Sequence, residues 1–215
     1  MENLIQTLAI YAIPVLFAIT LHEAAHGYVA RHFGDPTAWQ LGRITLNPAR
    51  HIDPFGTLLV PALLLFFSKG AFMFGWAKPV PVDFSRLRKP KQDMLWVAAA
   101  GPGANLAMAL AWAVLLKLAV LMPENAYSLP LAEMARAGIN VNAVLMLLNL
   151  LPIPPLDGGR IAVSLLPYRL AVKFAQIERF GFAIILALLF LGGLDLILTP
   201  LLRSFLFFIK NLFAF

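Results

Sequence analysis

Long uncharged apolar stretches alternate along the chain with short polar and basic segments. Four stretches stand out, at residues 3–21, 94–116, 137–156 and 180–194. A membrane-spanning helix needs about 17 to 25 mostly apolar residues. Three of the stretches meet this length, and the fourth is shorter but can serve as a span if Asp195 lies at the membrane surface. The pattern therefore predicts an all-α polytopic membrane protein.

Two further apolar segments do not predict simple spans. Residues 54–76 lie between the segments 34–53 and 75–93, which both carry basic residues and should both stay in the cytoplasm. This favours a re-entrant or hairpin insert over a single crossing, which remains the alternative. In the tail, Arg203 and Lys210 are seven residues apart and so share a helix face, which indicates an interfacial amphipathic helix.

Charge distribution predicts the orientation of the spans. The loop at 86–91 and the segment 160–179 are basic, whereas the connection at 122–127 has one Glu and no Lys or Arg. Because basic loops stay in the cytoplasm, the span at 94–121 should run outward and the one at 131–156 should return. The next one, at about 180–199, should then run outward again. We therefore expect a multi-pass protein of the cell membrane.

Composition agrees with this class. The chain is 60% hydrophobic and 13% charged, against about 25% charged residues in soluble domains. The net charge of +6 lies in loops beside the spans, which indicates contact with lipid headgroups and no nucleic-acid partner. The absence of cysteine excludes disulfides and thiolate chemistry. We expect one domain over 1–215, with a core at 4–165 and a C-terminal span plus interfacial helix at 180–215.

The first span ends in "HEAAH", which places ionisable groups where they are expensive. His22 and His26 are four residues apart, so both rings project from one face of a helix and can bind one Zn²⁺. Glu23 lies beside them and is a candidate general base, since zinc lowers the pKa of its bound water to about 7. Two ordinary histidines are the alternative, but ionisable residues at membrane depth are rare and usually functional.

A catalytic zinc site usually has three protein ligands, and two residues compete to be the third. His32 is six residues after His26, which is over half a turn off the ligand face of an unbroken helix. Asp157 is the better candidate, because it follows the proline-broken segment "PIPP" and precedes two glycines at the end of an apolar span. Irregular backbone at membrane depth is tolerated where it is buried or lines a water-filled cavity.

Together, "HEAAH" and "NLLPIPPLDGG" resemble the paired motifs of the site-2 protease family of intramembrane zinc metalloproteases. A third match, "AAAGPGANLAMA" at 98–109, is similar to a segment that the family carries between them, and "GRITLNPARHIDPFG" and "FGWAKPVPVD" are similar to its compact branch. The resemblance covers most of residues 15–165. It implies that "GRITLN" belongs to a small membrane-embedded β-like loop that offers backbone pairing to a substrate. It also implies that the chain lacks the PDZ or CBS domains of larger members.

The resemblance assigns a role to each matching residue. His22, His26 and Asp157 would ligate one Zn²⁺ per chain, and Glu23 would be the catalytic base and later the proton donor. Asn149 would bind the substrate backbone or the developing oxyanion, with an interhelical hydrogen bond as its alternative role. Asn105, in the third motif, is expected to pack between helices.

We therefore expect an intramembrane zinc endopeptidase that cuts a membrane-protein substrate within or near its transmembrane segment, with the active site toward the cytoplasmic side. One alternative is a catalytically inactive metal-binding membrane protein, a scaffold or a transporter. Glu23 argues against it, because ligand duty does not require this residue. A second alternative is a structural subunit whose polar residues only join helices, and such a protein would hold no stoichiometric zinc.

Overall fold

The computed structural model describes residues 2–59, 63, 78–123 and 125–215, and within these ranges the chain is helical without any β-strand. The α-helices are α1 (Glu2–His32), α2 (Thr37–Gln40), α4 (Pro90–Leu121), α5 (Ser128–Asn149), α6 (Asp157–Leu165), α7 (Tyr168–Ala175), α8 (Glu178–Phe190) and α9 (Gly193–Phe213). Shorter turns are η1 (Pro48–Arg50), η2 (Pro54–Leu59) and η3 (Phe84–Arg86). The predicted all-α fold is confirmed.

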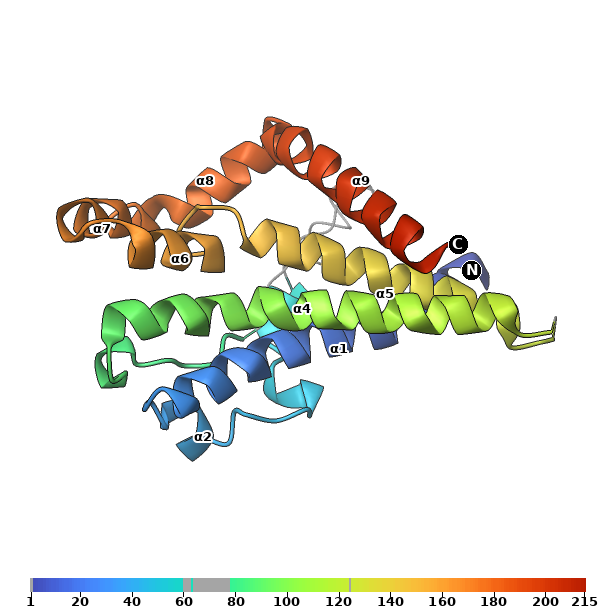
Figure 1. Ribbon diagram of the computed structural model, residues 1–215, viewed down its shortest axis with the longest axis horizontal. Helices are drawn as coiled ribbons and strands as arrows, with labels where there is room; N and C mark the ends of the chain where they lie inside the picture. The colour runs from blue at the N-terminus through green and yellow to red at the C-terminus, as the bar shows by residue number, and fades with distance from the viewer. Residues whose placement is uncertain (1, 60–62, 64–77, 124) are drawn as a thin grey trace.

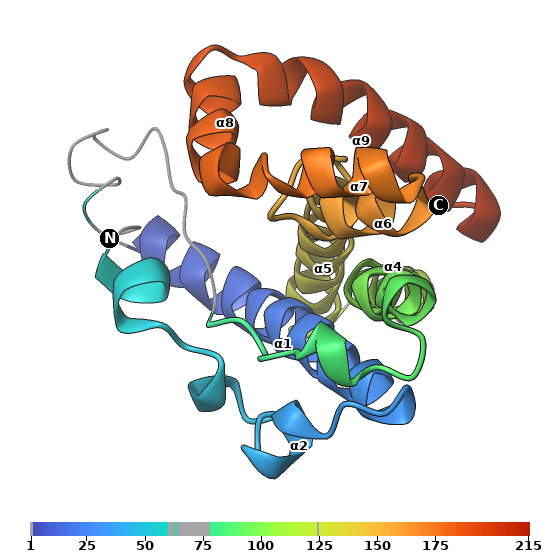
Figure 2. The same ribbon diagram turned by 90° about the vertical axis from the view of Figure 1, so that its left-hand side faces the viewer.

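Three long helices form the centre of the molecule. α1, α4 and α5 each pack against the other two, and α6 packs on α4. Figure 1 shows α4 and α5 running side by side along the long axis, with α1 beside them. In the end-on view of Figure 2 the three helices stand at the corners of a triangle, with α6 to α9 on one side of it and α2 on the other. This arrangement brings the HEAAH turn of α1 against α4 and the start of α6.

Small residues let the long helices approach closely. A buried apolar cluster between α4, α5 and α9 consists mainly of alanines: Ala113, Leu116, Ala119, Ala132, Ala135, Ile139 and Ile209. At Gly138 of α5, a Cβ atom would lie 2.3 Å from the ring of Trp112 on α4, so only glycine fits there. Close van der Waals contact between small residues is the main attraction between helices in lipid.

Four helical segments are long and apolar enough to cross a membrane: Ala9–His32, Pro90–Leu121, Ser128–Asn149 and Gly193–Phe213. The chain is therefore a multi-pass membrane protein. The first three segments overlap the spans expected from the apolar pattern, although the third begins and ends earlier.

The C-terminal part differs from the expectation. The predicted span at 180–199 is not one helix, because α8 ends at Phe190 and Gly192 adopts a left-handed φ of 74°. The predicted separate tail helix at 201–215 is also wrong, since these residues continue α9, which begins at Gly193. Gly192 breaks the apolar run near its middle, and the helix restarts with enough apolar residues for a span of its own.

Two other expectations concern the N-terminal half. The insert at 54–76 is described only at 54–59, which form η2, and at 63; the predicted re-entrant element otherwise lies outside the described residues. Residues 42–47 ("GRITLN"), expected to be β-like, form an irregular loop without strand pairing to the rest of the described chain. Pairing of this loop with a substrate stays a prediction.

Candidate metal centre

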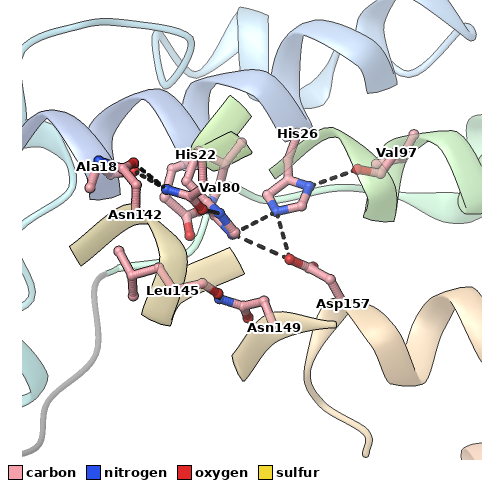
Figure 3. A network of polar contacts seen from close by, with 11 residues as sticks. Ala18, His22, His26, Val80, Val97, Asn142, Leu145, Asn149 and Asp157 are labelled. Carbon is pink, nitrogen blue, oxygen red and sulfur yellow. Dashed lines mark hydrogen bonds and ion pairs between the residues drawn. The ribbon is translucent and has the colours of Figure 1, made fainter. Parts of the chain in front are cut away.

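α1 brings two histidines of the HEAAH turn together. His22 and His26 are one helical turn apart, and their Nε2 atoms lie 3.1 Å from each other. The two rings meet edge to face, at 81° and with 4.7 Å between their centroids. Figure 3 shows both rings pointing from α1 toward Asp157. The two rings therefore project from one face of the helix, as their spacing of four residues predicts.

The third polar group comes from a distant part of the chain. α5 ends at Asn149, the proline-rich segment turns back, and Asp157 opens α6. The turn is tight, since a Cβ atom at Gly158 would lie 2.3 Å from the carbonyl oxygen of Leu150. Asp157 Oδ2 lies 3.2 Å from His22 Nε2 and 3.3 Å from His26 Nε2.

Hydrogen bonds on the far side of each ring determine where its proton sits. His26 Nδ1 lies 2.7 Å from the carbonyl oxygen of Val97, which can only accept, so Nδ1 carries the hydrogen. His22 Nδ1 lies 2.6 Å from Asn105 Oδ1. The amide of Asn105 is oriented by its own Nδ2, which donates to the carbonyl of Ala18 over 3.2 Å. In its neutral form, each ring therefore directs an unprotonated Nε2 toward Asp157.

Three lone-pair atoms thus converge within 3.1–3.3 Å of one another. Such atoms repel unless a cation lies between them, and Asp157 Oδ2 is buried without a hydrogen-bond donor among the described residues. Two ligand atoms of a tetrahedral zinc, each about 2.0 Å from the metal, lie about 3.3 Å apart. The two imidazoles and the carboxylate therefore fit a zinc ion in both donor type and spacing.

Gly101 of α4 supplies the space that a metal would need. A Cβ atom at this position would lie 2.4 Å from His26 Nε2 and 2.6 Å from His22 Nε2. Any side chain larger than hydrogen would occupy the region where the ligand atoms converge. The glycine of the "AGPGAN" segment is thus part of the candidate metal centre.

The centre is shielded from solvent. The exposed fractions of His22, His26 and Asp157 are 8%, 9% and 7%. A carboxylate binds a metal in its ionised form, and a zinc ion between the three atoms would hold Asp157 in that form.

A buried polar chain behind His22 links all three long helices. Asn105 Nδ2 donates to Asn142 Oδ1 over 3.0 Å, and Asn142 Nδ2 donates to the carbonyl of Gly138 over 2.8 Å. Both asparagines are fully buried. Asn105 packs between helices as expected, and it also orients a candidate metal ligand, which the sequence did not indicate. Partners of this kind fix the ring and tautomer of metal-binding histidines.

The remaining candidates lie close by. Glu23 is half-buried, and its Oε2 accepts a hydrogen bond from the N–H of Val80 over 2.6 Å. Asn149 lies at the end of α5 on the side of Asp157 (Figure 3), and its Nδ2 donates to the carbonyl of Leu145 over 3.0 Å. His32 is exposed and stacks edge to face with Phe33, outside the cluster. The choice of Asp157 over His32 as the third member agrees with this geometry.

Comparison with known proteins assigns the chain to a family. The model of "Peptidase family M50" matches residues 119–192. A Bacillus subtilis protein named "Putative zinc metalloprotease YwhC" is 40% identical over 195 residues, which cover 89% of this chain and 85% of that protein.

Two mycobacterial proteins are also similar, both named "Putative zinc metalloprotease Rip2". The one from Mycolicibacterium smegmatis is 31% identical over 84% of this chain and 66% of its own length. The one from Mycobacterium tuberculosis is 34% identical over 66% of this chain and 52% of its own length. No solved structure matches the chain. The extent of the similarity to YwhC, together with the family match around Asp157, shows that this chain belongs to peptidase family M50, the site-2 protease family.

Proposed function

We propose that this zinc metalloprotease hydrolyses a peptide bond within or near a transmembrane segment of a membrane-protein substrate. The observation that carries the proposal is the convergence of His22, His26 and Asp157 beside Glu23, inside a bundle of apolar helices. The family and the names of the relatives support zinc protease chemistry. The location of His22, Glu23 and His26 in a candidate span supports a substrate in the membrane.

Each residue has a role in this reaction. His22, His26 and Asp157 hold the zinc, which when bound polarises a water molecule and the scissile carbonyl. Glu23 takes a proton from the attacking water and later delivers it to the leaving amine. One of its carboxylate oxygens is held by the Val80 N–H, which leaves the other for the water. Asn149 donates from Nδ2 to the substrate carbonyl as negative charge develops there.

The substrate must lose its helical hydrogen bonds before it can react. A carbonyl inside a regular helix is bonded to an N–H four residues later, so the cut residue has to lie in a locally unwound segment. Helix-breaking residues near the cut should therefore speed cleavage.

Orientation follows from charge at the ends of the helices. Arg31 lies at the end of α1, Lys89 and Lys91 at the start of α4, and Arg169 and Lys173 in α7. Arg31, Lys89 and Lys91 thus adjoin the ends of α1 and α4 that lie nearest to the metal centre, and Arg169 and Lys173 lie in the segment that follows α6. The positive-inside rule supports a cell-membrane protein with its active site toward the cytoplasm. The described helices also agree with a single domain over 1–215.

Cleavage in proteoliposomes tests the proposal. Wild type and Glu23→Gln would be reconstituted with a tagged single-span substrate, and the cut would be mapped by mass spectrometry. We expect cleavage inside or within a few residues of the apolar segment by wild type, and no cleavage by Glu23→Gln. A second substrate with a helix-breaking residue near the cut should react faster. Cleavage only in soluble parts of the substrate would contradict the intramembrane reaction.

The alternative is a catalytically inactive metal-binding scaffold. It shares the zinc site but gives no role to Glu23. Identical behaviour of wild type and Glu23→Gln on a broad panel of membrane substrates, with zinc bound to both, would favour it.

A further inference from the structure

The backbone segment 78–83 lies against the catalytic turn of α1. Val80 is buried and donates its N–H to Glu23 Oε2 over 2.6 Å. Its side chain faces Gly27, one turn further along α1, where a Cβ atom would lie 3.0 Å from Val80 Cγ1. A main-chain amide therefore orients the carboxylate of Glu23.

Arg43 binds the other side of the same peptide group. Its Nη2 donates to the carbonyl of Lys78 over 3.0 Å and to the carbonyl of Pro79 over 3.3 Å. The Pro79 carbonyl and the Val80 N–H belong to one peptide unit. A positive guanidinium thus faces the oxygen end of this dipole, and a negative carboxylate faces its N–H end. Hydrogen bonds in such a chain polarise and strengthen one another.

Neighbouring contacts keep the segment in place at both ends. The N–H of Lys78 donates to the carbonyl of His51 over 2.9 Å, and the buried His51 ring bonds the carbonyl of Thr45 over 3.0 Å. At the far end, the N–H of Asp83 donates to Oδ2 of the fully buried Asp35 over 2.7 Å. Between these anchors, Arg43 and Glu23 bond opposite ends of the Pro79–Val80 peptide.

We infer that Arg43 is a positioning residue for Glu23 and acts through the Pro79–Val80 peptide. This inference rests on the proposed role of Glu23 as the base. Loss of the guanidinium leaves the Val80 N–H present but free to tilt, so Glu23 loses its alignment with the attacking water. A shift of about 1 Å in a catalytic group can cost about 100-fold in rate. Arg43 lies in the loop expected to pair with a substrate through its backbone, and the inference concerns only its side chain, which bonds the carbonyls of Lys78 and Pro79.

The test compares Arg43→Met and Arg43→Lys with Arg50→Met, which removes an exposed arginine from the same loop. Arg43→Met should lower kcat about 10- to 100-fold, with KM within about twofold of wild type and unchanged zinc per chain. Arg43→Lys should restore most of the loss, because an ammonium also donates to the two carbonyls. Arg50→Met should behave as wild type. A residue that only stabilises the fold would change the melting temperature and the folded fraction, without this selective fall in kcat.

Hydrogen exchange gives a readout that does not depend on activity. Pro79 and Pro81 have no amide hydrogen, so exchange within 79–81 reports Val80 alone. In zinc-free protein, Arg43→Met and Glu23→Gln should each speed this exchange, and the double variant should add little to either.

The kinetic comparison and the hydrogen-exchange measurement together separate failure of this inference from failure of the proposed function. Wild-type kcat in Arg43→Met, or unchanged Val80 exchange in that variant, would overturn the inference even in an active protease. If wild type cleaves no substrate, the exchange experiment alone decides whether Arg43 and Glu23 are coupled through Val80.

Discussion

Asn105 holds His22: its Oδ1 lies 2.6 Å from His22 Nδ1, across the contact between α4 and α1. The bond leaves His22 Nε2 unprotonated and directed at Asp157. The same asparagine bonds α5 through Asn142, so one buried amide connects the helix packing to the metal centre. Changes in the packing of the three helices should therefore change the affinity for zinc.

Replacing Asn105 by Ala tests this connection. We expect about 10- to 100-fold weaker zinc binding, the usual effect of losing a partner behind a metal-bound histidine. Asn140→Ala is the matched control, since Asn140 is an exposed asparagine of α5 whose Nδ2 donates to the carbonyl of Arg136 in its own helix. Zinc titration against a competing chelator measures both. Equal affinities would show that Asn105 has only a packing role.

Substitution of two glycines of α4, one at a time, tests whether Gly101 leaves the space that the metal needs. Gly101→Ala should abolish stoichiometric zinc binding, because its Cβ would lie 2.4 Å from His26 Nε2. Gly103→Ala should bind zinc normally, since a Cβ at that position would meet no atom within 4 Å in the described residues outside its own stretch of helix. Both changes are Gly to Ala in one helix, so circular dichroism should show the same helix content. Normal zinc content in Gly101→Ala would place the metal elsewhere.

Zinc should stabilise the fold through Asp157. At a free concentration of 100 times Kd, a ligand that binds only the folded state adds about 2.7 kcal/mol to the free energy of unfolding. The melting temperature of metal-free wild type should therefore rise with zinc, and that of Asp157→Ala should not. Asp195→Ala, at an exposed aspartate of α9, serves as the control. An equal rise in the melting temperature of Asp157→Ala would show that this carboxylate does not bind the zinc.

Asn149 should affect the reaction and not the metal. Asn149→Ala is expected to bind zinc normally and to lower kcat about 100-fold or more, as loss of an oxyanion donor does. Asn211 is an exposed asparagine that makes a similar side-chain bond, to the carbonyl four residues earlier in α9. Asn211→Ala removes this bond and should leave kcat unchanged. If kcat is unchanged in Asn149→Ala, its contact with the Leu145 carbonyl is its whole role.

The candidate metal centre could be predicted because each of its two motifs can be recognised within a short stretch of the sequence. A spacing of four residues places two histidines on one helix face, and the proline-rich turn before Asp157 indicates backbone that needs a polar environment. The partners behind them were not predictable. Whether Asn105 faces His22, and whether Gly101 faces the ligand atoms, depends on how α4 crosses α1, which residue spacing does not reveal.

The predicted bounds of the C-terminal helices were wrong for a different reason. The run at 180–199 is nearly uncharged, and hydropathy does not distinguish a continuous span from two helices joined at a bend. Gly192 makes the bend possible because its positive φ suits glycine. Likewise, no pattern in the sequence links Val80 to Glu23, since that bond joins an irregular segment to a helix.

The most direct test of the account is a paired measurement on purified protein: zinc per chain, and cleavage of a tagged single-span substrate, for wild type and Glu23→Gln. The account predicts about one zinc per chain in both proteins, and cleavage by wild type alone. Absence of stoichiometric zinc from wild type, or equal cleavage by both proteins, would contradict it.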